Sequence, residues 1–167
     1  VMAAQFGASM AYPGRADQER IGPSSRRTAV VISEIMYRPA ARSDGRNLEY
    51  IELYNSQPWS QDISGFRVKG DIDFTFPANT ILGADSYLVL AKAPLDVQQV
   101  CQIANLTGGY SGKLPGSEGR VRLEHRSGAV LLDVHYRDEA PWPAGASGTG
   151  HSIVLARPSL GESDPKA

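Results

Sequence analysis

The 167-residue sequence predicts an all-β domain, a sandwich or barrel of about eight short strands with one short helical connection. Three observations support this class. Residues 48–55, LEYIELYN, alternate with the period of two that is typical of a strand with two different faces. Similar segments recur along the chain between clusters of turn residues. Hydrophobic residues make up 41% of the chain and charged residues 21%, which is the composition of a globular domain with a core.

The first half of the predicted domain has four strands. Residues 29–37 are β-branched and apolar, and Pro39 ends this strand. Residues 48–55 form the alternating strand, and the turn sequence NSQPW follows it. Residues 62–70 and 72–77 are two further strands, because KGD between them and PANT after them are turn residues.

The second half contains the only predicted helix. Residues 86–92 are an apolar strand, and in residues 94–103 the apolar positions have the spacing of one or two helical turns. Residues 121–125 and 130–136 flank RSGA, which predicts a hairpin. Residues 151–156 provide the last strand.

The chain divides into one domain with two flanking segments. Residues 1–28 are polar, with prolines and glycines, and we interpret them as a linker or an ordered lead-in. The domain is predicted over residues 29–158, and residues 159–167 form a polar tail. No apolar run approaches the roughly 20 residues of a membrane span.

Three glutamates on the first two predicted strands are the first candidates for chemistry, because paired carboxylates serve glycosidases and metal sites. Glu34 and Glu52 each alternate with apolar residues and could meet across adjacent strands, and Glu49 lies on the other side of the second strand. We favour a simpler interpretation for all three, a solvated sheet face with Arg67 or Arg122 nearby, because charged residues are seldom buried.

Two acidic pairs in predicted turns provide a weaker signal. Asp71 and Asp73 are two residues apart and could face the same way, as ligands of a hard cation do, but a calcium loop needs several more oxygen ligands. Asp138 and Glu139 are similar. We interpret both pairs as turn acids that prevent sheet edges from associating.

The residues of nucleophilic and metal chemistry form no pattern. His125, His135 and His151 fall on three different predicted strands, without the close spacing of metal ligands, and we expect each to be half-buried. Cys101 is the only cysteine, so it forms no internal disulfide, and we expect it to pack as a small apolar residue. The glycine-rich residues 145–150 precede a strand and not a helix, which disfavours a phosphate-binding loop. The sequence therefore predicts no catalytic residue, no metal site and no cofactor.

The charge of the chain argues against a binder that depends on a positive field. The formal net charge is −1, although Arg20, Arg26 and Arg27 lie close together before the predicted domain. We therefore expect nucleic-acid binding to be weak and strongly salt-dependent if it occurs at all.

Taken together, the segments VVISEIMYRPA, LEYIELYN, DISGF and IDFTFPANTILGADSYLVLAK, with GYSGKLPGSEGRVRLEHRSGAVLLDVHY further on, resemble the lamin tail domain family in its prokaryotic form. The resemblance covers residues 29 to about 157. It implies an immunoglobulin-like β-sandwich with no established catalytic residues. One departure is Pro115, which stands where such sequences usually read LSNSGE and which changes the expected shape of that loop.

The resemblance implies a non-catalytic module that binds proteins, anchors or adheres within a larger multidomain protein. Prokaryotic members accompany exported enzymes and surface modules, so an exported or cell-surface location is expected, with a cytoplasmic or nuclear one as the alternative. Another class of function is a carbohydrate- or cation-binding accessory module of a hydrolase. Exposed aromatic rings would favour it, and Tyr50, Tyr54 and Trp59 are the candidates.

Trp142 stands between Pro141 and Pro143 and needs a separate explanation. The resemblance places it between two strands, where the ring would close one end of the sandwich and the prolines would hold the chain away from the sheet edge. The alternative is a ring displayed for a partner. We favour the structural plug, because leaving so much apolar area in water is unfavourable. Trp59, which follows Pro58 in a predicted turn, is the better candidate for an exposed ring.

Overall fold

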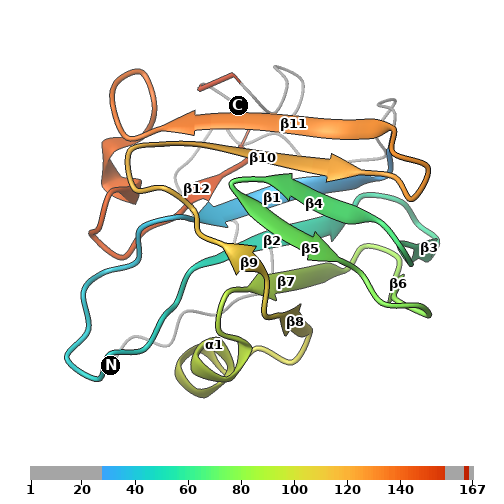
Figure 1. Ribbon diagram of the computed structural model, residues 1–167, viewed down its shortest axis with the longest axis horizontal. Helices are drawn as coiled ribbons and strands as arrows, with labels where there is room; N and C mark the ends of the chain where they lie inside the picture. The colour runs from blue at the N-terminus through green and yellow to red at the C-terminus, as the bar shows by residue number, and fades with distance from the viewer. Residues whose placement is uncertain (1–27, 157–163, 166–167) are drawn as a thin grey trace.

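The computed structural model describes residues 28–156 and 164–165 and shows two β-sheets packed face to face (Figure 1). In spatial order, the first sheet consists of β12 (Ile153–Val154), β1 (Val30–Met36), β2 (Tyr50–Asn55), β7 (Tyr87–Ala91) and β8 (Leu106–Gly108). The second consists of β11 (Val130–Arg137), β10 (Glu118–Glu124), β4 (Arg67–Gly70), β5 (Ile72–Thr75) and β9 (Ser111–Gly112). A small third sheet pairs β3 (Gln61–Asp62) with β6 (Ile81–Leu82). The predicted all-β sandwich is therefore confirmed.

The main core lies between the two sheets and is formed mainly by the longer strands. From the first sheet it receives Val30, Ile32, Ile35, Ile51, Leu53, Leu88 and Leu90. From the second it receives Val68, Ile72, Val121, Leu123, Leu132, Val134 and Tyr136. Burial of these side chains is the main stabilising contribution, because removing apolar surface from water is worth roughly 25 cal/mol per Å².

The one α-helix, α1 (Pro94–Cys101), confirms the helix predicted over residues 94–103. Proline is favoured in the first turn because the N–H it lacks has no partner there. Gln102 ends the helix in the left-handed conformation, with φ 56°. The helix connects β7 to β8. These two strands form the only parallel pair of the first sheet, and a parallel pair requires a crossover connection. No helix in the described part of the chain is long and apolar enough to cross a membrane.

The described residues form twelve strands, more than the eight or so predicted. The predicted strand 62–70 is interrupted, because Gly65 has φ +71° and the N–H of Phe66 bonds the carbonyl of Ile63 at 3.0 Å in a tight turn. The other additional strands have only two or three residues, which is too short for a period of two to be recognised. Residues 1–27, 157–163 and 166–167, which include most of the predicted lead-in and tail and the last two residues of the predicted domain, lie outside the described residues.

Candidate binding surface

The end of the sandwich that carries β3 and β6 is organised by Asn55, the fully buried last residue of β2. The Asn55 side-chain amide donates to the carbonyl oxygens of Trp59 and Gly83, each at 2.8 Å, and of Leu82 at 3.2 Å. Its Oδ1 accepts from the N–H of Gln57 at 3.1 Å. These bonds hold the turn after β2 against the chain around β6, because leaving a buried amide without partners costs free energy.

Two large apolar side chains are exposed on this framework. Trp59 is 59% exposed and Ile81 is 58% exposed, although both are large apolar residues. Ile81 pairs across the small sheet with Asp62, whose carboxylate lies 3.9 Å from the Arg126 guanidinium of the β10–β11 turn. We call Trp59, Gln61, Asp62, Ile81 and Arg126 the Trp59 apex. Figure 1 shows β3, β6 and the β10–β11 turn at the same end of the molecule.

The expectation that Tyr50 and Tyr54 are exposed aromatics is wrong. Tyr50 is 1% exposed and packs in a cluster with Val97 of α1, and Tyr54 is 9% exposed and stacks on Tyr87 with 4.4 Å between ring centroids. The alternation in β2 predicted two faces correctly, but both faces are covered. Of the three predicted aromatics, only Trp59 is accessible to a ligand.

Trp142 lies at the edge of the sandwich where β11 and β12 approach each other. The ring is partly buried and packs against the main core, and Pro141 and Pro143 on either side are exposed. Trp142 lines a cleft of about 40 Å³ with Val134 of β11 and Ile153 of β12. This volume accommodates a few water molecules at most and is far below a typical ligand pocket of about 300 Å³ or more. The role of Trp142 as a structural plug stays a prediction.

The interpretation of the three glutamates as residues of a solvated face is also wrong. Glu49 is 8% exposed, and its Oε1 accepts from the Tyr110 hydroxyl at 2.8 Å and from the Leu114 N–H at 2.7 Å. These bonds fasten the loop before β10 to the start of β2. Glu52 is 6% exposed, and Glu34 is half-buried. The two carboxylates do meet across β1 and β2, as the alternation suggested.

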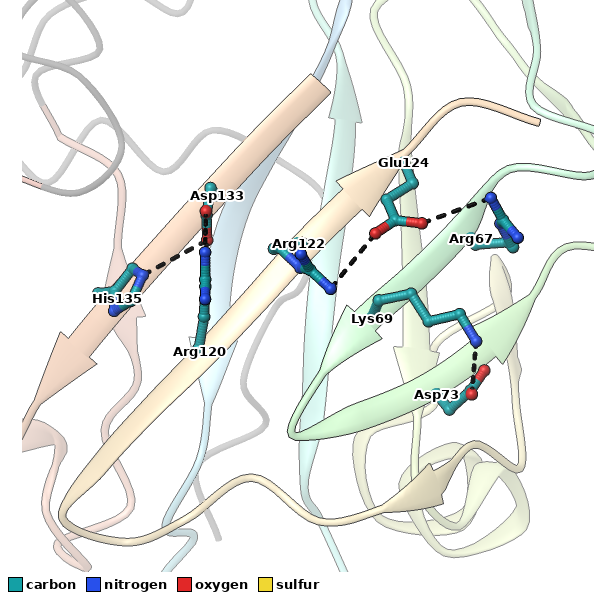
Figure 2. A network of polar contacts seen from close by, with 8 residues as sticks. All are labelled: Arg67, Lys69, Asp73, Arg120, Arg122, Glu124, Asp133 and His135. Atoms are coloured by element: carbon teal, nitrogen blue, oxygen red, sulfur yellow. Dashed lines mark hydrogen bonds and ion pairs between the residues drawn. The ribbon is translucent and has the colours of Figure 1, made fainter. Parts of the chain in front are cut away.

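The expected arginines lie on the opposite outer face. Figure 2 shows Arg67 and Arg122 on either side of Glu124, at 3.5 and 3.4 Å, in a network over β4, β5, β10 and β11. In the same network Arg120 binds Asp133 through two hydrogen bonds of 2.9 and 2.6 Å. The network has four cations, Arg67, Lys69, Arg120 and Arg122, and three carboxylates, because Arg67 and Arg122 share Glu124, so this face presents only a small positive excess.

The remaining candidates are dispersed. His135 and His151 are exposed rather than half-buried, and His125 lies just after β10 in the hairpin turn, beside Phe66. Cys101 packs beside the Tyr50 cluster, and burial raises the pKa of its thiol. Asp71 accepts from the Arg120 N–H at 2.6 Å. The described residues contain no group of three or more His, Cys, Asp or Glu side chains that could hold a metal ion.

The fold and the candidate surface define the class of protein, an all-β sandwich domain with an exposed aromatic apex. The family model described as Lamin Tail Domain matches residues 23–138. This chain therefore belongs to the Lamin Tail Domain family, which confirms the resemblance, and the domain itself is non-catalytic. β12 lies beyond the matched residues but pairs with β1. A comparison with curated proteins gives no match.

Proposed function

We propose that this domain is a binding module of a larger, exported or cell-surface protein, and that it binds a protein partner through the Trp59 apex. The observation that carries the proposal is the exposure of Trp59 on a turn that Asn55 fixes through its hydrogen bonds. Tryptophan at the centre of an interface contributes strongly to affinity. A fixed backbone also reduces the entropy that is lost on binding.

The alternatives from the sequence have less support. A carbohydrate-binding module would need a row of accessible rings, and burial of Tyr50 and Tyr54 removes two of the three candidates. The arginines proposed for nucleic-acid contact, Arg20, Arg26 and Arg27, lie outside the described residues. We therefore retain protein binding as the proposed function.

The test is site-specific photo-crosslinking from the apex. A photoreactive residue at Ser60, which is exposed beside Trp59, should capture the partner in extracts of the source cells. We expect Trp59→Ala to weaken binding of the captured protein by at least about thirty-fold, which corresponds to the 2 kcal/mol of a hot spot. The matched control is Leu95→Ala, because Leu95 is 71% exposed but lies on α1.

Two results would contradict the proposal. Equal affinities of the wild-type and Trp59→Ala domains would mean that the apex is not the contact surface. Binding to a glycan array that disappears in Trp59→Ala would instead favour the carbohydrate alternative.

A further inference from the structure

Two glutamates face each other on the outer face of the first sheet. Glu34 of β1 and Glu52 of β2 are direct partners in the antiparallel register, so their Cβ atoms are about 5 Å apart. None of the ion pairs among the described residues includes either carboxylate. Like charges directly opposite each other in a sheet are destabilising, and burial strengthens the repulsion. The pair therefore favours a state in which one member holds a proton.

The groups around the pair are neutral or acidic. Burial raises the pKa of Glu52 to about 7, and the charge of Glu34 also contributes. Among the described residues, the other titratable side chains that interact with the pair or line the cleft beside it are Tyr50, Tyr87, Cys101 and Asp164. Arg42 acts on Cys101, and no interaction joins it to either glutamate. No described cation is therefore placed to neutralise a second negative charge.

Hydrogen bonds connect this pair to the segment that contains β12, the edge strand of the first sheet. The Oε1 atom of Glu34 accepts from the Tyr50 hydroxyl at 2.6 Å and from the hydroxyl of Ser152, the residue just before β12. The Oε1 atom of Glu52 accepts from the Ser33 hydroxyl at 2.8 Å. Glu34 thus accepts hydrogen bonds both from Tyr50 of β2 and from Ser152, the residue before β12.

β12 has few other hydrogen bonds. β12 has two residues, which pair with Glu34 and Ile35, and the N–H of Leu155 bonds the Ser33 carbonyl at 2.9 Å. Trp142 lies beneath it in the cleft. A strand this short gains little from its backbone ladder, so the Ser152–Glu34 bond acts together with the packing of Ile153 on the main core and of Leu155 beside Val31 and Tyr54.

We propose that Glu34 and Glu52 form a proton-operated latch, which holds β12 on β1 while Glu52 is protonated and loosens it when both glutamates are charged. In the charged state the repulsion displaces Glu34, the more exposed of the two, and its bond to Ser152 is lost. β12 then opens more often, and the Trp142 cleft becomes accessible to water. The latch is independent of the Trp59 apex and of its partner.

Hydrogen exchange of the intact chain tests the latch. The readout is the protection factor of the Leu155 amide, the ratio of its intrinsic to its measured exchange rate, which removes the ordinary effect of pH on exchange. We expect a loss of about tenfold between about pH 6 and about pH 8, if opening returns Glu52 to its ordinary pKa. In Glu52→Gln, which keeps the shape and cannot ionise, the protection factor should be the same at both pH values.

Several results would overturn the latch. One is a wild-type Leu155 protection factor that does not change with pH, and another is the same change in Glu52→Gln. Equal protection of Leu155 and of the β10–β11 amides would also overturn it, because β12 would then open only when the whole domain unfolds. A wild-type protection factor that does not change with pH overturns the latch even if a variant fails to fold.

Fluorescence of Trp142 provides a second readout. In a Trp59→Phe background Trp142 is the only tryptophan of the chain, so acrylamide quenching reports access to the cleft. We expect quenching to increase from about pH 6 to about pH 8, and this increase to be absent when Glu52→Gln is added. An increase that persists with Glu52→Gln would assign the opening to another group.

Discussion

Two glutamates on opposite outer faces of the sandwich are buried to a similar extent but have opposite surroundings. Glu52 is 6% exposed and faces Glu34, whereas Glu124 is 9% exposed and lies between Arg67 and Arg122. The charge of Glu52 is therefore uncompensated, and that of Glu124 is compensated twice. The comparison shows that burial alone does not determine what a carboxylate does to stability, because the neighbouring charge decides the sign.

The difference arises from what covers each sheet. All six residues of β2 are buried, because the core covers one face, and on the other face Tyr50 packs in the cluster with Val97 of α1 and Tyr54 packs with Val31, Leu155 and Tyr87. In β11, buried residues alternate with exposed or partly exposed ones, so one face remains in contact with water. A sheet with one solvated face can carry paired charges at little cost, and a sheet covered on both faces cannot.

The largest expected effect tests the covered face. Tyr50→Ala should lower the free energy of unfolding by about 3–5 kcal/mol, because it removes a buried aromatic ring next to Val97 and leaves a cavity. Chemical denaturation measures this. The matched control is Lys69→Ala on the outer face of the second sheet, where the side chain is partly exposed and the effect should be within about 0.5 kcal/mol. Similar losses in the two variants would contradict the contrast between the faces.

The next effect concerns the uncompensated charge. The pKa of Glu52 is raised from 4.5 to about 7 in the folded state, so the native protein binds more protons than the unfolded chain between these values. The free energy of unfolding should therefore fall as pH rises from about 4.5 to about 7, by up to about 3 kcal/mol. Above the folded-state pKa this contribution should no longer change.

Glu52→Gln should remove that pH dependence. The variant should be more stable than the wild type at about pH 8, by up to about 3 kcal/mol, and nearly equal to it at about pH 5. Denaturation curves at the two pH values measure the difference. A variant that is less stable at about pH 8 would show that a positively charged group stabilises the Glu52 carboxylate.

The sequence predicted the strands and the helix better than it predicted which residues pack against them. The alternation of residues 48–55 predicted a strand with two faces, and the spacing of residues 94–103 predicted a helix. Neither pattern shows that the helix packs on Tyr50, or that Leu155 and Tyr87 pack on Tyr54. Tyr50 and Tyr54 were therefore expected in solvent, although both are buried. Coverage depends on tertiary packing, which local periodicity does not contain.

The placement of charges was predictable only in part. Glu34 and Glu52 alternate with apolar residues, and this pattern suggested correctly that they could meet across adjacent strands. The arginines expected beside them lie instead on the other sheet, since the partners of a strand depend on register and topology. Trp59 was easier to place, because a ring next to Pro58 in a turn has few neighbours.

The smallest predicted effect concerns the same substitution on the opposite face. Glu124→Gln should destabilise the domain by about 1 kcal/mol, because it removes the charge that Arg67 and Arg122 share and leaves two like charges together. The loss should decrease at high salt, since these arginines are partly exposed and screening weakens their mutual repulsion. At about pH 8 the two Glu→Gln variants should therefore change the free energy of unfolding in opposite directions. The same sign in both would mean that burial, and not the neighbouring charge, determines the effect.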